Sequence, residues 1–178
     1  MLDPTLEAKL LRAETEIKRL GTDGTALQDV DRIAADALDY AGEHGLQIPV
    51  NRRDNIAYTV AKAYLVRSRE KIREMQRDKD KQRRHAEEVF EMMDRVEYFD
   101  AKCDSGFTRQ RENREARSYV YKQAVDYALD VIGVMIDNGK KDVARGYFTL
   151  TMQYLKMSGI GAKKKKLDKV QAALNGDI

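Results

Sequence analysis

Residues 51–101 contain neither glycine nor proline, although the chain of 178 residues has 11 glycines and 2 prolines. Such a run favours a long helix, because the two residue types that most often end helices are missing from it. Apolar residues recur through it at alternating spacings of three and four, the heptad pattern of a helix with one apolar stripe. The stripe positions are Tyr58, Ala61, Leu65, Ser68, Ile72, Met75, Lys79, Gln82, Ala86, Val89, Met93 and Val96.

The middle of this stripe is polar. Lys79 and Gln82 occupy two consecutive core positions, and residues 76–85 contain no apolar side chain. A continuous helix of about 48 residues would be roughly 70 Å long, whereas a compact domain of this chain length has a radius of gyration of roughly 16 Å. We therefore expect one of three structures: the helix projects from the body of the fold, it pairs with another chain, or it breaks near residues 76–85.

Shorter helices are predicted on both sides of this run. Asp3 is the expected N-cap of a first helix that begins with Pro4 and ends near residue 20, and a second helix covers residues 26–43. Three more are expected at residues 109–138, 141–157 and 162–174, and the short turns between them make them antiparallel neighbours. In the helix at 141–157 one apolar stripe contains Val143, Tyr147, Leu150, Tyr154 and Met157.

These patterns predict an all-α fold in three parts. The first is an acidic N-terminal helical pair at residues 1–50, which hold 5 basic and 10 acidic side chains. The second is the long amphipathic, coiled-coil-like helix at residues 51–102. The third is a basic, antiparallel three-helix body at residues 109–178, and residues 101–178 hold 15 basic and 9 acidic side chains. The overall net charge of +3 is too small to demand a nucleic-acid partner by itself.

Cysteine usage and hydropathy indicate the compartment. Cys103 is the single cysteine, so an intramolecular disulfide is excluded and a reducing compartment is favoured. The first 14 residues mix charged and apolar side chains where a secretory signal needs an apolar core. No apolar stretch approaches the roughly 20 residues of a membrane span. We expect a cytoplasmic protein without a membrane partner, with Cys103 as a surface thiol.

Signals for catalysis or metal binding are weak. His85 and Glu88 share a helix face, and Asp126 and Asp130 could add carboxylates, but His85 borders the most polar stretch of the chain, where a dry metal cavity is not expected. Cys103 has no histidine near it in the sequence to act as a base. We therefore predict no enzyme, and no catalytic residue, cofactor or metal site.

Residues 154–170 contain an apolar helix, the turn Gly159-Ile160-Gly161, and a second helix with Lys163 near its start. This arrangement resembles the helix-hairpin-helix element of non-specific DNA-binding proteins, although Lys165 and Asp168 depart from its pattern of small and apolar residues. The resemblance implies phosphate contacts from Gly159, Gly161 and Lys163, because hairpin N–H groups and the helix N-terminus hold a phosphate in that element.

Two basic segments have more than one interpretation. Residues 62–84 hold ten bases against four acids, whereas residues 87–100 hold six acids and one base. These opposite signs favour antiparallel pairing of the long helix with a second copy, and the basic half would alternatively lie along a phosphate backbone. Residues 163–166 are four lysines in the first turn of a helix, where positive charges interact unfavourably with the helix macrodipole. An anionic partner, or the acidic first 50 residues, would offset this cost.

The favoured function is that of a non-enzymatic adaptor or assembly protein, acting as a homo-oligomer or as a subunit of a larger complex through its long helix. Polar positions in the stripe would set the register of pairing. The predicted interface residues are Leu65, Ile72, Met75, Lys79, Gln82, Val89, Met93 and Val96. The alternative is a nucleic-acid-binding accessory protein, with phosphate contacts from Gly159, Gly161, Lys163, Lys164, Lys165, Lys166, Arg77, Arg83 and Arg84.

Overall fold

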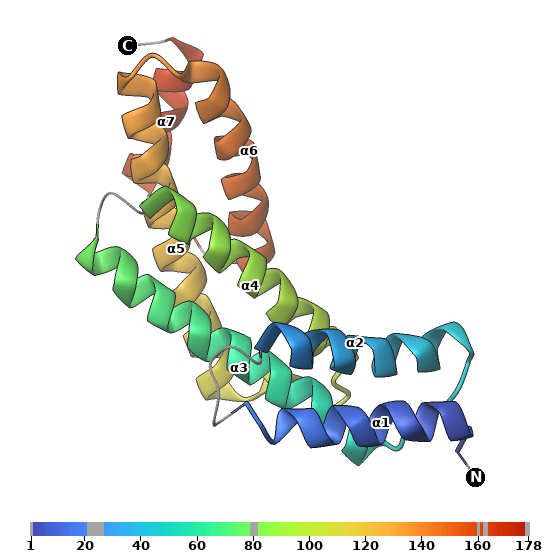
Figure 1. Ribbon diagram of the computed structural model, residues 1–178. Helices are drawn as coiled ribbons and strands as arrows, with labels where there is room; N and C mark the ends of the chain where they lie inside the picture. The colour runs from blue at the N-terminus through green and yellow to red at the C-terminus, as the bar shows by residue number, and fades with distance from the viewer. Residues whose placement is uncertain (1, 21–26, 79–81, 160, 162–163, 177–178) are drawn as a thin grey trace. The chain divides into compact units, whose positions relative to one another are not determined.

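The computed structural model describes residues 2–20, 27–78, 82–159, 161 and 164–176, and for residues 82 and 83 it describes the backbone. Within these ranges every regular element is a helix, which confirms the predicted all-α fold (Figure 1). The elements are α1 (Pro4–Ile17), α2 (Leu27–Glu43), α3 (Val50–Arg77), α4 (Gln82–Lys102), the 3-10 helix η2 (Phe107–Arg109), α5 (Arg111–Asp137), α6 (Lys141–Ser158) and α7 (Lys164–Asn175).

Local sequence signals set several helix ends. The Asp3 side chain accepts a hydrogen bond from the Leu6 backbone N–H at 2.9 Å, and Pro4 begins α1, as predicted. Gly139 after α5 and Gly159 after α6 have φ angles of 74° and 65°. These left-handed conformations suit glycine and terminate the helices before the short turns.

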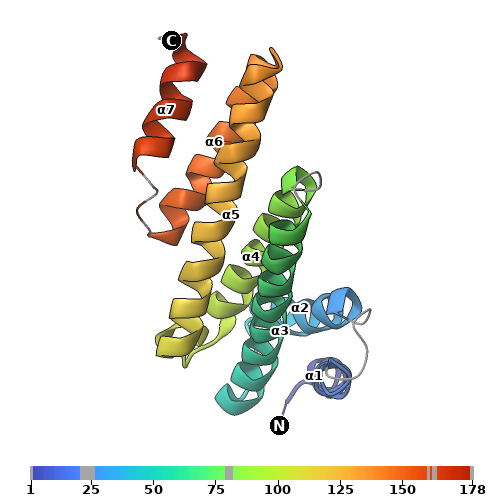
Figure 2. The ribbon, with the colours of Figure 1, turned by 90° about the vertical axis from the view of Figure 1, so that its left-hand side faces the viewer.

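The run without glycine or proline folds as two helices instead of one. α3 ends at Arg77, α4 begins at Gln82, and the two lie side by side (Figures 1 and 2). The prediction of one unbroken helix over residues 51–102 is therefore corrected, and of its three outcomes the break is observed. The physical reason lies in residues 76–85, which offer no apolar side chain for burial, so that folding back there covers the apolar stripes on either side.

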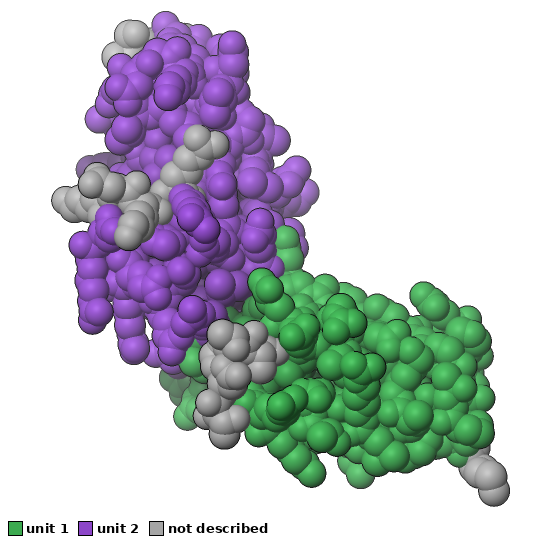
Figure 3. Space-filling view, in the orientation of Figure 1, with its two compact units in different colours: residues 1–66, 94–114 green, residues 67–93, 115–178 purple. Residues whose placement is uncertain are grey.

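The chain divides into two compact units (Figure 3). Unit 1 comprises residues 1–66 and 94–114, and its core contains the buried stripes of α1 and α2. Arg52 in the first turn of α3 joins that helix to α1, with Nε 2.6 Å from Glu14 Oε1 and Nη1 2.7 Å from Glu7 Oε2. Oppositely charged groups on the two helices therefore reinforce the apolar packing of unit 1.

Unit 2 comprises residues 67–93 and 115–178. Its core brings the second half of α3 and the first half of α4 together with α5, α6 and α7. Phe90 of α4 stacks on Tyr154 of α6 with ring centroids 4.2 Å apart and an interplanar angle of 2°. Large side chains that are almost fully buried fill the rest of the core, among them Ile72, Met75, Met93, Tyr121, Leu129 and Ile132.

Cys103 is buried, so the prediction of a surface thiol is wrong. Its Sγ atom lies 3.3 Å from Ser105 Oγ in the turn that follows α4. A turn position does not by itself expose a side chain, and a free cysteine often packs as a small apolar residue.

None of the helices that the structure describes is both long enough and apolar enough to cross a bilayer.

Candidate functional site

The apolar residues predicted to meet a partner lie inside the chain's own core. Each of the six is at most 3% exposed: Leu65, Ile72, Met75, Val89, Met93 and Val96. Folding α4 back onto α3 covers the stripe within one molecule, which corrects the assignment of these side chains to an external interface. Lys79 lies outside the described residues, and Gln82 is the first residue of α4.

Helices α6 and α7 are joined by the turn that resembled a helix-hairpin-helix element. Gly159 and Gly161 are exposed, Lys163 lies outside the described residues, and the first two residues of α7, Lys164 and Lys165, are exposed. Lys166 is only partly exposed. The turn therefore presents backbone and two lysine side chains to solvent in the part of it that the structure describes.

Lys166 is engaged by carboxylates of α5. Its Nζ atom donates to Asp126 Oδ1 at 2.9 Å and to the Asp126 carbonyl oxygen at 2.8 Å, and it lies 2.7 Å from Asp130 Oδ2. These contacts hold α7 against α5 and give Lys166 a structural role, while its contact with phosphate stays a prediction. Asp126 and Asp130, which the sequence suggested as metal ligands, are the ion-pair partners of Lys166.

Basic side chains of α3 form a row that sequence reasoning missed. Arg69, Arg73 and Arg77 recur every four residues, and all three are exposed. A spacing of four places them on one face of the helix. Arg84 on α4 is also exposed and donates to Glu88 Oε1 at 3.0 Å, whereas the side chain of Arg83 is outside the described set.

The His85–Glu88 pair belongs to an ion-pair cluster around Lys71. Lys71 Nζ lies 2.8 Å from Glu74 Oε2 and 3.1 Å from Glu88 Oε2, and His85 Nδ1 lies 3.5 Å from the same Glu88 atom. The hydrogen bond from Lys71 lowers the pKa of Glu74. Burial alone would raise the pKa of Glu88, but Lys71 and His85 together lower it. Among the described side chains no three His, Cys, Asp or Glu residues gather in a way that would hold a metal ion.

Replacing Lys71 by methionine is expected to weaken the dependence of stability on acidic pH. A carboxyl group whose pKa is lowered in the folded protein stabilises the fold fully when the pH is above its ordinary pKa of 4.5. This stabilisation is lost as the pH falls through the lowered pKa. The variant should therefore lose less melting temperature than the wild type between about pH 6 and about pH 3. Lys122→Met, at an exposed position of α5, is the matched control. Equal losses in Lys71→Met and the wild type would show that the cluster adds no pH-dependent stability.

Helix α6 exposes several large apolar side chains. Tyr147 and Tyr154 of the predicted stripe are buried, but Val143, Leu150 and Met157 of the same stripe are 49%, 37% and 51% exposed. Their spacing of seven places them in one line along the helix. The periodicity identified the stripe, but the core covers only the two tyrosines.

A second face of α6 is also apolar. Phe148, Met152 and Leu155 line a shallow hollow of about 710 Å³, whose edges include Lys156 and Gly159. All three apolar side chains are half-buried. The helix therefore carries partly or fully exposed apolar side chains beyond its buried face, which is typical of a surface that contacts another protein.

Comparison of the chain with known protein families, with curated proteins and with solved structures finds no match.

Proposed function

We propose that this chain is a non-enzymatic helical assembly protein that pairs with a second copy of itself along α6. The observation that supports the proposal is the exposed line of Val143, Leu150 and Met157. Gly146 and Gln153 fall between them, so the five positions follow the three–four spacing of a helix-pairing seam. The seam replaces the buried stripe of α3 and α4 as the proposed protein interface.

The order of residues along the seam favours an antiparallel pair of α6 helices. Leu150 is at the centre, so in a two-fold pair it would face its own copy, and Val143 would face Met157. Asp142 and Lys156 adjoin the two ends of the line, and both are exposed. An antiparallel pair would bring these opposite charges close to each other at both ends.

Gly146 adds a second argument. Glycine within a helix costs roughly 1 kcal/mol relative to alanine, and a Cβ atom placed on Gly146 would have no neighbour within 4 Å. Packing inside the molecule therefore does not require a glycine there. Close approach of a second helix would account for it, because a missing side chain lets two helix backbones come together.

Leu150→Glu is expected to abolish self-association, because it would place two carboxylates against each other at the centre of the pair. Sedimentation velocity of the wild type over a concentration series should show a species of twice 20.4 kDa, and the variant should remain at the monomer mass. Thr149→Glu, at the exposed neighbouring position on a different face of α6, should still dimerise. A wild-type protein that stays monomeric up to about 0.5 mM would refute the proposal.

A second candidate function is nucleic-acid binding, which the row of Arg69, Arg73 and Arg77 favours. The three exposed guanidinium groups would contact backbone phosphates, with further contacts from Lys164 and Lys165. We place the protein in the cytosol in either case, where Cys103 would stay reduced.

Fluorescence anisotropy with labelled duplex DNA over a salt series tests the second candidate. Binding should weaken steeply as salt rises, and Arg73→Gln should reduce the slope of log affinity against log salt by about 1. Arg12→Gln, at an exposed position of α1, should leave the slope unchanged. Undetectable binding at low salt would eliminate this candidate.

A further inference from the structure

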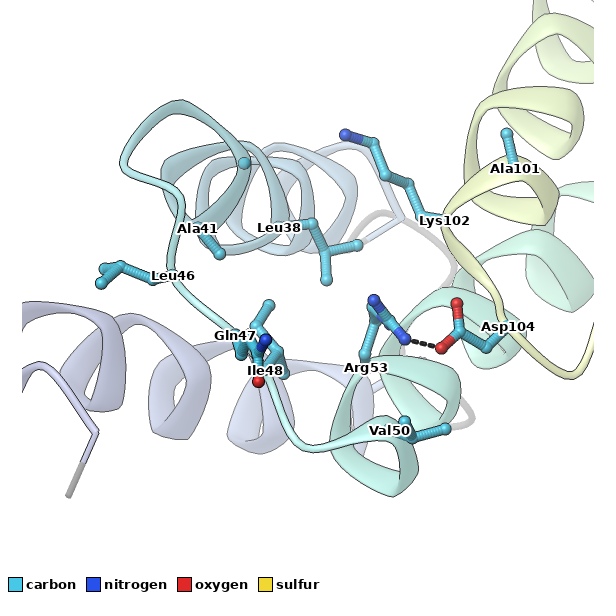
Figure 4. A pocket seen from close by; sticks show the side chains of 11 residues that line it. Leu38, Ala41, Leu46, Gln47, Ile48, Val50, Arg53, Ala101, Lys102 and Asp104 are labelled. Atoms are coloured by element: carbon cyan, nitrogen blue, oxygen red, sulfur yellow. Dashed lines mark ion pairs between the residues drawn. The ribbon is translucent and has the colours of Figure 1, made fainter.

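Unit 1 contains a half-enclosed pocket of about 450 Å³ (Figure 4). Its walls come from the end of α2, the connector before α3, the first turn of α3 and the end of α4. The volume lies within the range of roughly 300 to 1,000 Å³ that is typical of small-molecule sites. The lining residues are Leu38, Ala41, Gly42, Leu46, Gln47, Ile48, Val50, Arg53, Ala101, Lys102 and Asp104.

One wall of the pocket is apolar. Leu38 and Ala41 of α2 face it from one side, and Leu46 and Ile48 of the connector line another part of it (Figure 4). Pro49 keeps the connector from continuing as a helix, and the extended backbone places these residues at the pocket. An apolar group of a ligand would be removed from water here.

The polar side of the pocket is dominated by the guanidinium group of Arg53, which points into the space between Leu38 and Asp104 (Figure 4). One terminal nitrogen is paired with Asp104 Oδ2. The Nε atom is buried and has no hydrogen-bond acceptor within the part of the chain that the structure describes. The fold therefore leaves part of the hydrogen-bonding capacity of this guanidinium unused.

The two cations of the pocket lining are paired with carboxylates, and both pairs are partly exposed. The lining holds two cations, Arg53 and Lys102, and one carboxylate, Asp104, which is about half exposed. Lys102 is directed toward α2, where its Nζ atom lies 2.8 Å from Asp39 Oδ1. An ion pair as exposed as that of Asp104 contributes little stability, so a ligand carboxylate can share or replace it at small cost.

Asp104 is itself held in place. The two carboxylate oxygens of Asp54 accept hydrogen bonds from the backbone N–H groups of Asp104 and Ser105, at 2.8 and 3.0 Å. Asp54 follows Arg53 near the start of α3, so one short segment positions both the turn after α4 and the guanidinium group. The polar side of the pocket is therefore already organised before any ligand binds.

We propose that this pocket binds a small organic monoanion, a carboxylate with a short apolar tail. The carboxylate accepts hydrogen bonds from Arg53, and the tail lies against Leu38, Leu46 and Ile48. A guanidinium is suited to this role because its planar donors match the geometry of a carboxylate.

Hexanoate is the probe, with 1-hexanol and hexylammonium as neutral and cationic probes of the same tail length. In a titration followed by amide NMR shifts, hexanoate should bind saturably with a dissociation constant on the order of 1 mM, as expected for a ligand of this size. The shifts should centre on the backbone amides of Gly42 and Ala101. The other two probes should bind at least about tenfold more weakly, since they cannot pair with a guanidinium.

Two variants separate ligand binding from folding. Arg53→Gln should weaken hexanoate binding at least about tenfold, and Arg32→Gln, on an exposed part of α2, should leave it unchanged. Gly42→Leu should abolish binding without loss of melting temperature, because a Cβ atom at Gly42 meets open space and the larger side chain would occupy the pocket. Equal binding of hexanoate and hexanol, unchanged binding in Gly42→Leu, or no saturable shift with hexanoate would each overturn the proposal.

Discussion

Replacing Ile72 by alanine is expected to lower the free energy of unfolding by about 3 kcal/mol and to leave the mass in solution unchanged. Ile72 is fully buried in unit 2, so truncation removes apolar contacts and leaves a cavity that its neighbours fill only in part. Urea denaturation measures the first effect, and light scattering after gel filtration measures the second.

Val66→Ala is the matched control, because Val66 is on the same helix but 48% exposed. Its expected cost is below about 0.5 kcal/mol. If Ile72→Ala were as stable as the wild type but changed the mass in solution, the stripe of α3 would contact another chain after all, and the fold-back of α4 would be wrong.

The stripe of α3 and α4 illustrates what periodicity predicts and what it leaves open. Spacings of three and four identified Ile72 and Val89 as members of a buried face, and both are buried. The same spacings carry no information about which surface covers that face, since a second copy and a second helix of one chain satisfy them equally. The polar residues 76–85 were the local signal for a break, and they lie where the helix ends.

Contacts between residues far apart in the sequence were beyond prediction. Lys166 was grouped with its neighbouring lysines as a phosphate contact, but its partners Asp126 and Asp130 are on α5. The packing of α7 on α5 decides that pairing, and no local pattern encodes it. The ends of helices were predictable for the opposite reason, because the Asp3 cap acts within one turn.

The exposed apolar line of α6 could be predicted from the sequence only in part. The stripe from Val143 to Met157 was evident in the sequence, but its residues divide between the core and the solvent. The helix rests on its neighbours through Tyr147 and Tyr154, and the buried ring of Phe90 that stacks on Tyr154 fixes this orientation. A small rotation of the helix would bury a different set, so the exposed line followed only from the packed structure.

Asp31 is a buried carboxylate that forms an ion pair within unit 1. It is 9% exposed and accepts a hydrogen bond from Tyr64 Oη at 2.6 Å and another from Arg95 Nε at 2.8 Å, while Arg95 Nη2 pairs with its second oxygen. Burial and the hydrogen bond to Asp31 raise the pKa of Tyr64, so its hydroxyl remains a donor. One carboxylate thereby joins α2 to α3 and α4.

Asp31→Ala is expected to lower the free energy of unfolding by about 2 to 3 kcal/mol, because it removes the carboxylate to which both Arg95 and the Tyr64 hydroxyl donate. The Arg95 side chain is 34% exposed and regains some hydration, which keeps the loss below that of a fully buried pair. Tyr64→Phe removes one donor only and should cost about 1 kcal/mol in the same urea measurement.

The Asp31→Ala/Arg95→Ala double variant should be more stable than the sum of the two single losses predicts, since it leaves no unpaired charge. Additive losses would mean that the pair contributes no coupling energy. A loss in Asp31→Ala no larger than that in Tyr64→Phe would mean that packing alone joins α2 to α3 and α4. The expected non-additivity follows from burial. Each single variant leaves a polar or charged group without its partner in a partly buried place, which costs stability, whereas the double variant removes both partners.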